Sequence, residues 1–231
     1  MQRLYFLSLT IGISVLLGAC QNNAPKATKP KEKLFIDFFV RYLSDESQLK
    51  AQASFSEGIS PDESRPKQIE GGVAFQSSGM LEQNIQGKVI RYELERQGEY
   101  TGSFPFNMKD DEGQQREYLL EMSPIEDFFI KGEISKSKGM KLVVNGGLIK
   151  ANEQLVLLFS DEESRAYSIT LSGPAKNIEF DLSPDQTAPL RPGPGKLYLV
   201  KRQDNVEEDE EISLVSSIEY YTSAIDIEVV E

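Results

Sequence analysis

The side chains that most often carry catalysis are scarce in this sequence. It contains no histidine, and Cys20 is its one cysteine. Composition therefore excludes catalytic Ser-His and Cys-His pairs, and metal sites built on histidine. Residues 47–50 and 135–138 have the spacing Ser-x-x-Lys, which on a helix would bring a lysine beside a serine nucleophile. Neither stretch has a helical pattern and the companion motifs are missing, so we interpret both as coincidence.

Carboxylates are the other candidates for chemistry, because a pair of them can hydrolyse a glycosidic bond. In such a pair one carboxyl is the acid and the other is the base or the nucleophile. The chain has 37 acidic residues, and so many acids bring some close together without any catalytic role. We expect a protein that is not an enzyme, and keep a carboxylate-based glycan hydrolase as an alternative. The acids in or near expected strands are Asp37, Glu93, Glu117, Glu121 and Asp127.

Three acidic runs, at 110–112, 161–163 and 207–211, offer the oxygen ligands that calcium prefers. None has the spaced Asp-x-Asp-x-Asp-Gly pattern that ends in a glutamate. Adjacent acids repel one another and face water, so we expect solvated loops, no metal site and no cofactor. A module that binds calcium or another ligand stays as a further alternative.

Tyr220 and Tyr221 are adjacent in the last expected strand, so their rings must point to opposite faces. We expect one ring in the core and the other exposed. The outward ring would also suit a platform for a sugar or a partner.

Cys20 ends a segment with the parts of an export signal. Arg3 supplies the positive start, residues 4–17 are apolar, and Gly18 and Ala19 are small. An apolar span of about 14 residues is too short for a transmembrane helix, which needs about 20. The tetrad from Leu17 through Gly18 and Ala19 to Cys20 resembles the lipobox of bacterial lipoprotein precursors.

The lipoprotein resemblance implies a diacylglyceryl thioether on the Cys20 sulfur, cleavage after Ala19, and a third fatty acid such as palmitate on the new amino terminus. Two or more acyl chains hold a protein firmly on a membrane. An ordinary signal peptide with an incidental cysteine is the alternative. Gln21, in place of Asp, resembles lipoproteins sorted to the outer membrane. We therefore expect a lipid anchor in the bacterial cell envelope, at the outer membrane and facing the periplasm.

The segment after Cys20 is polar and basic, with Lys26, Lys29, Lys31 and Lys33 against one acid, Glu32. We expect a flexible tether, which as a coil spans roughly 20 Å. The remaining body, from residue 34 on, holds all the other acids and has a large excess of negative charge. It lacks the basic surface that phosphate binding requires, so nucleic acid is excluded as a partner.

The hydrophobic pattern from residue 34 on has a period of two, which is typical of strands. Residues 34–42 and 49–55 both alternate. Phe35 and Phe39 add apolar weight to the second face of the first run, which favours either a strand buried on both sides or a helix. Further strands are expected at 73–76, 88–95, 99–106, 117–122, 155–159, 167–171, 178–182, 195–200 and within 212–230.

Turn signals separate these strands. We expect a long loop at 56–72 and a single helical turn at 124–129, capped by Ser123. The sequence Asn145-Gly146-Gly147 predicts a tight hairpin. Three prolines and two glycines at 189–195 exclude a helix there.

Residues 138–231 resemble an immunoglobulin-like sandwich, in which a Pro-Gly-x-x-Tyr turn introduces one of the last strands. Pro194, Gly195 and Tyr198 match that pattern. The tryptophan and disulfide of antibody domains are absent, so the resemblance implies only the general sandwich class. It carries no activity with it.

Taken together, these patterns predict an all-β protein: tandem antiparallel β-sandwich domains after a signal peptide and a flexible tether. One larger sandwich is the alternative architecture. We expect a non-catalytic, lipid-anchored envelope protein that binds or scaffolds an envelope protein or glycan. The expected segments are the signal peptide at 1–19, the lipidated Cys20 and linker at 20–33, an N-terminal β-rich domain at 34–134 and a C-terminal immunoglobulin-like domain at 138–231.

Overall fold

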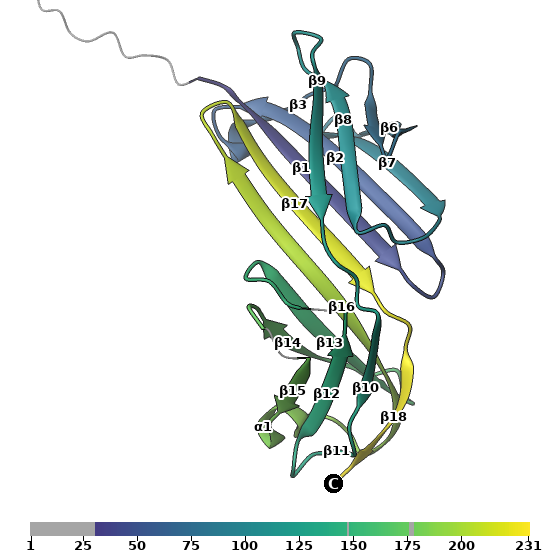
Figure 1. Cartoon of the computed structure of the whole chain (residues 1–231). Coiled ribbons are helices and arrows are strands. Elements are labelled where there is room, and N and C mark those ends of the chain that lie inside the picture. The colour runs from purple at the N-terminus through teal and green to yellow at the C-terminus, as the bar shows by residue number, and fades with distance from the viewer. Residues whose placement is uncertain (1–30, 147, 176–177) are drawn as a thin grey trace, which may run out of the picture. The chain divides into compact units, whose positions relative to one another are not determined.

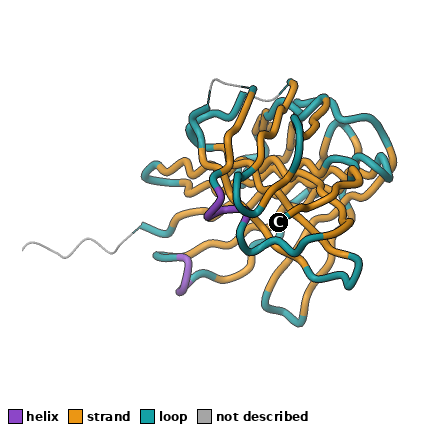
Figure 2. The backbone as a smooth tube through the Cα atoms, turned by 90° about the horizontal axis from the view of Figure 1, so that it is seen from below, coloured by secondary structure: helices purple, strands orange, loops and turns teal. Residues whose placement is uncertain are grey.

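The computed structural model describes residues 31–146, 148–175 and 178–231, and it consists almost entirely of β-strands (Figures 1 and 2). Within these residues there are two short helical turns, η1 at Pro61–Glu63 and α1 at Pro184–Thr187. The predicted all-β class is confirmed. Helix α1 was not predicted from the sequence, although Pro184 is well suited to a first helical position and Ser183 N donates to Gln186 Oε1 at 2.9 Å.

The first half of the chain forms a two-layered sandwich. Phe38 of one layer stacks on Phe106 of the other, with ring centroids 4.2 Å apart, so the inner faces of both layers meet in one core. One layer contains β1 (Lys33–Leu43), β2 (Gln48–Gly58), β3 (Arg65–Pro66), β6 (Leu81–Ile85) and β7 (Val89–Gln97). The other contains β4 (Val73–Phe75), β5 (Ser78–Gly79), β8 (Ser103–Lys109) and β9 (Gln115–Glu121).

The second half also has two sheets, the larger of which is continuous with the first layer above through a shared strand. A three-stranded sheet has the order β10-β12-β15, and a larger one contains β14-β13-β16-β18-β11. This division is consistent with the immunoglobulin-like sandwich class that Pro194, Gly195 and Tyr198 indicated. The strands are β10 (Asp127–Ile130), β11 (Ile134–Ser135), β12 (Met140–Asn145), β13 (Glu153–Asp161), β14 (Ala166–Ser172), β15 (Glu179–Leu182), β16 (Gly193–Glu208) and β18 (Ile225–Val230).

The 16-residue strand β16 belongs to both halves (Figure 1). Its residues 195–203 pair with β13, while its residues 200–208 pair with β17 (Ile212–Tyr221). Strand β17 in turn pairs with β1 in parallel. The hairpin β16–β17 therefore extends the first sheet to the order β16-β17-β1-β2-β7-β6.

Strand pairing thus crosses the predicted boundary between residues 134 and 138. The predicted N-terminal domain, 34–134, holds β1, and the predicted C-terminal domain, 138–231, holds its partner β17. Residues Lys31–Glu231 form one compact unit. The physical reason is that β16 continues beyond its pairing with β13 as the partner of β17, and β17 alternates buried and outward residues, so that the hairpin adds to the edge of β1.

Two local predictions are wrong. The helical turn expected at 124–129 is extended, because Phe128 pairs with Val144 and is buried as part of β10. The hairpin expected at 145–147 does not form, since β12 pairs with β10 and β15 and the next strand begins only at Glu153. In the loop expected at 56–72, β2 continues to Gly58, and η1 and β3 follow.

A buried ion pair lies where the two halves meet. Lys201 of β16 is 1% exposed, and its Nζ is 3.2 Å from Glu153 Oε2, which is fully buried. Lys201 also donates to the carbonyl oxygens of Ser123 and Leu148, both at 3.1 Å. Burial lowers the pKa of Lys201, and the charge of Glu153 opposes that shift. The Lys201 amine thus connects β16, the strand that both halves share, to the segment before β10 and to the loop before β13.

Candidate functional site

The candidate site is the outer face of the sheet β16-β17-β1-β2-β7. Strand alternation creates this face: in β1, Ile36, Phe38 and Val40 point into the core, and the residues between them point outward. The β4-β5-β8-β9 layer packs on the inner face. The outward residues are Phe35, Asp37, Phe39 and Arg41 of β1; Gln52, Ser54 and Ser56 of β2; Arg91 and Glu93 of β7; Ser213, Val215, Ser217 and Glu219 of β17; and Arg202 of β16.

Strand register arranges these side chains in rows. Facing positions in neighbouring strands lie about 4.8 Å apart, close enough for one ligand to touch several of them. The two central rows, each with one residue from β17, β1, β2 and β7, are Val215-Asp37-Ser54-Arg91 and Ser217-Phe39-Gln52-Glu93.

Two adjoining hollows lie on this face, and we call them together the trough. One has a volume of about 440 Å³ and is lined by Phe35, and the other has a volume of about 390 Å³ and is lined by Phe39. Asp37, Ser54 and Val215 line both, so the hollows adjoin at these residues. The space exists because small serine side chains stand between the larger ones on β2 and β17.

The two acids of the central rows differ in their surroundings. Burial raises the pKa of the Asp37 carboxyl, although the residue is exposed, and the charge of Arg91 opposes that rise. Glu93 Oε1 is 2.7 Å from Lys50 Nζ, and Glu93 Oε2 accepts from Gln52 Nε2 at 2.9 Å. The hydrogen bond from Lys50 lowers the pKa of Glu93. Glu93 is therefore committed to an ion pair, whereas Asp37 faces the hollow.

Asp37 and Glu93 are two of the acids that the sequence singled out, and the structure places both on this face. Their backbones are two strands and two residues apart, which is roughly 12 Å. Lys50 holds Glu93 on the side away from Asp37, whose register partner is Ser54. The carboxyls of a glycosidase pair lie only about 5 to 10 Å apart. This arrangement does not favour hydrolysis.

The other three acids lie elsewhere. Glu117 and Glu121 are exposed on β9, in the opposite layer. Asp127 begins β10, and its carboxylate accepts from Phe128 N at 2.8 Å. The structure does not bring them to the trough or to one another.

Neither Ser-x-x-Lys stretch forms a helix. Ser47 lies in the turn between β1 and β2, and Lys50 belongs to β2. Ser135 Oγ accepts from Lys138 N at 3.1 Å in a turn that Gly139 closes. These contacts support the interpretation that both spacings are coincidental.

The acidic loops are hairpin turns in which one aspartate accepts backbone hydrogen bonds. These bonds lower the pKa of Asp110, Asp161 and Asp209. Among the residues in the described ranges, no group of three or more acidic side chains is arranged to hold a metal ion. The backbone donors include Gln114 at 2.8 Å for Asp110, Arg165 at 2.9 Å for Asp161 and Ile212 at 2.7 Å for Asp209.

Tyr220 and Tyr221 point to opposite faces, as predicted. Tyr220 is buried and stacks with Tyr42, with ring centroids 5.6 Å apart. Tyr221 is on the outer face, where its ring lies 6.4 Å from that of Tyr198 and its hydroxyl donates to Glu219 at 3.1 Å. Burial, followed by the charge of Glu219, raises the pKa of Tyr221 to about 12. The outward tyrosine is therefore half-buried beside the trough.

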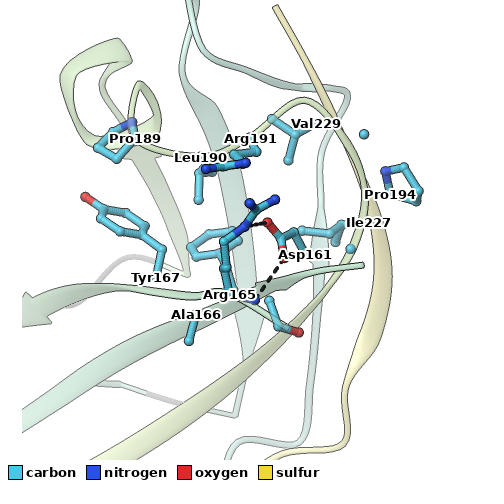
Figure 3. A pocket seen from close by; sticks show the side chains of 14 residues that line it. Asp161, Arg165, Ala166, Tyr167, Pro189, Leu190, Arg191, Pro194, Ile227 and Val229 are labelled. Atoms are coloured by element: carbon cyan, nitrogen blue, oxygen red, sulfur yellow. Dashed lines mark hydrogen bonds and ion pairs between the residues drawn. The ribbon is translucent and has the colours of Figure 1, made fainter. Parts of the chain in front are cut away.

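A smaller hollow of about 140 Å³ lies between β14, β16 and β18 (Figure 3). Its central cation, Arg165, donates from Nε to Asp161 at 2.7 Å and also pairs with Glu163. Tyr167, Pro189 and Leu190 line the space around this pair (Figure 3). Arg191 also lines this hollow, whose volume is about a third of that of either hollow in the trough, so it has room only for a smaller ligand.

The trough was not predicted from the sequence. Its signal was the pair Phe35 and Phe39 on the polar face of the first strand, which favoured burial on both sides or a helix. The structure instead leaves both rings half-buried in the hollows. The local sequence pattern does not show which strands lie beside β1. The outward residues of its neighbours could therefore not be grouped with Phe35 and Phe39 into one face.

The predicted signal peptide at 1–19, the lipidation site Cys20 and most of the linker lie outside the described residues. Only the last three linker residues are described, and β1 already begins at Lys33. No helix in the described part of the chain has the length and apolar character needed to cross a membrane.

Comparison with known proteins gives no family for this chain. No family model matches the sequence, and the search of curated proteins finds no relative. Among solved structures, a tetra-tandem repeat from the extending region of a large adhesion protein is similar, with 12% identity and a TM-score of 0.27. The match covers 83% of this chain and 49% of that one, so the chain spans about half the length of the solved structure.

Proposed function

We propose that this chain is a non-catalytic lipoprotein of the bacterial envelope that binds another envelope component in the trough. The observation that carries this proposal is the trough itself: a hollowed sheet face that no second layer of the described residues covers, and on which aromatic, aliphatic and charged side chains are mixed. Such a mixture of apolar surface and a few convergent polar groups is typical of binding sites.

The lipid anchor is the second part of the proposal, and it rests on the lipobox from Leu17 to Cys20. Acylation of Cys20 would hold the body at the outer membrane, facing the periplasm. In bacteria that express the protein, Cys20→Ser should abolish fatty-acid labelling and move the protein from the membrane to the soluble fraction. Continued labelling of the variant would refute the anchor.

Capture of envelope material tests the trough. Purified lipidated protein is immobilised in detergent and incubated with a detergent extract of envelopes. Ser54→Trp fills the centre of the trough and should reduce the captured material at least fivefold. Ser168→Trp is the matched control, because Ser168 is an exposed strand serine of β14 that does not line the trough. Equal capture by both variants would contradict the proposal.

A carboxylate-based hydrolase is the second candidate, since Asp37 has a raised pKa and faces a hollow. The wide separation of Asp37 from Glu93, and the ion pair of Glu93 with Lys50, argue against it. A calcium-binding module has less support, because the aspartates of the acidic turns already accept backbone hydrogen bonds.

A further inference from the structure

We propose that the trough binds an extended glycan, with sugar rings lying on Phe35 and Phe39 and sugar hydroxyls bonded to the polar side chains between and around them. This inference rests on the proposed function and names the class of partner.

The position of the trough within its sheet disfavours a peptide strand as the occupant. Extended peptides gain most of their affinity by pairing with the free backbone groups of an edge strand. Strands β17, β1, β2 and β7 are each paired on both sides, so their backbone groups are engaged within the sheet. A ligand on this face contacts side chains and not free backbone groups. It must therefore carry many hydrogen-bonding groups that can pair with the polar side chains.

The alternation of apolar and polar side chains suits the surface of a sugar. A pyranose ring has flat faces made of C–H groups and a rim of hydroxyl groups. Phe35 and Phe39 are on the same strand face, four residues or roughly 13 Å apart, so two rings of one extended chain can each meet an aromatic side chain. Ser54 and Ser217 are small and leave room above the sheet for the rings between them.

Polar groups in the trough are available for hydroxyl partners. Within the described ranges, the Arg91 guanidinium has no ion pair or hydrogen bond, and the carboxylate of Asp37 accepts none. These groups stand in one row, and together they offer planar donors and acceptors to neighbouring hydroxyls. Gln52 lies in the next row, beside Phe39.

The charged side chains that line the trough favour a glycan over an apolar partner such as a hydrophobic helix. The trough is lined by Lys88, Arg91 and Arg202 against Asp37 and Glu219, so it does not share the acidic excess of the whole chain. Arg202 already pairs with Asp204, but an apolar helix would leave Arg91 and Asp37 buried without partners, which is unfavourable. A neutral or weakly acidic glycan keeps them hydrogen-bonded.

Calorimetric titration of the purified lipidated protein with oligosaccharides tests the inference. The probes are chitohexaose and cellohexaose, whose β-linked rings form flat ribbons, and maltohexaose, whose chain coils. We expect a flat ligand to bind in preference to maltohexaose. Phe39→Ala should weaken binding at least tenfold and Gln52→Ala at least threefold. Phe129→Ala, which alters a Phe that is 45% exposed on β10, should not change it. Thermal unfolding shows whether each variant is folded.

Treatment of the envelope extract separates a glycan from a protein partner. Lysozyme, chitinase and cellulase hydrolyse the β-1,4 bonds of flat glycans, and a mixture of them should abolish the capture that Ser54→Trp reduces, while protease treatment should leave that capture intact. Capture that survives the glycoside hydrolases but not protease would overturn the glycan and leave the proposed function standing. Capture that Ser54→Trp does not change would overturn both.

Discussion

At the scale of single residues, the most consequential group is the buried amine of Lys201. Its amine contacts one carboxylate and two carbonyl oxygens, and the side chain is 1% exposed. Composition did not indicate it, because a lysine in a strand is ordinarily exposed. The alternation that predicted opposite faces for Tyr220 and Tyr221 was sufficient there, since that outcome follows from strand geometry alone.

Removal of the Lys201 charge should destabilise the fold strongly. Lys201→Met leaves Glu153 as an uncompensated buried charge, a change that costs about 3 to 5 kcal/mol. Lys196→Met, in the same strand, alters a lysine whose 3.7 Å pair with Asp226 is exposed, and should change stability little. Urea unfolding measures both. The double variant Lys201→Met with Glu153→Leu should recover much of the loss, and a single variant as stable as wild type would contradict this account.

The turn aspartates make stability depend on acid. Hydrogen bonds lower the folded-state pKa of Asp110, Asp161 and Asp209 below the ordinary value near 4. The stability that they contribute is therefore complete above that value and is lost as the pH falls through the lowered folded-state values. Asp161→Asn should make the thermal midpoint fall less steeply in acid, whereas Asp62→Asn, in the exposed η1 turn, should not. A parallel acid profile for Asp161→Asn and wild type would count against the assignment.

At the scale of elements, the hairpin β16–β17 decides the architecture. Most strands were predictable because their hydrophobic residues alternate, as in β1, β2 and β14. The parallel pairing of β1 with β17 was not, since it joins residues about 180 positions apart and has no local signal. For the same reason the trough could not be assembled from sequence, although Phe35 and Phe39 marked it.

A fragment that ends at residue 134 should not fold. The fragment lacks β16 and β17, so one edge of β1 has no partner strand. The core residues Ile36, Phe38 and Val40 also lose their buried neighbours Leu214 and Ile218. We expect residues 31–134 to show no cooperative thermal transition in circular dichroism, while residues 31–231 melt cooperatively. A cooperative melt of the short fragment would support the independent N-terminal domain that the sequence predicted.

The turn between β11 and β12 requires glycine for two reasons. Gly139 has φ of +85°, and a Cβ at this position would overlap the carbonyl oxygen of Leu182. Gly71 has a similar φ of +81° with open space around it. Gly71→Ala should cost about 1 kcal/mol, and Gly139→Ala at least about 1 kcal/mol more because the backbone must shift. Equal losses in urea unfolding would show that the close approach has no effect.

At the scale of the whole molecule, the predicted tether meets the body beside an acidic hairpin end. Lys31 pairs with Glu211, and Lys33 pairs with Glu208 at 2.9 Å and donates to the carbonyl oxygen of Asp209 at 2.7 Å. The start of β1 is thus fixed to the β16–β17 hairpin that also supplies one side of the trough. The contacts of Lys31 and Lys33 thus connect the end of the predicted tether to the hairpin that borders the proposed binding surface.

Thiol labelling in the envelope tests the central claim, that the trough is occupied there. The chain has one cysteine, Cys20, so a second can be introduced alone at Ser54, in the trough, or at Ser168, outside it. A maleimide should label Ser54→Cys rapidly in the purified protein and at least tenfold more slowly in intact envelope fragments, while Ser168→Cys labels alike in both. Equal rates for Ser54→Cys in the two settings would contradict the account.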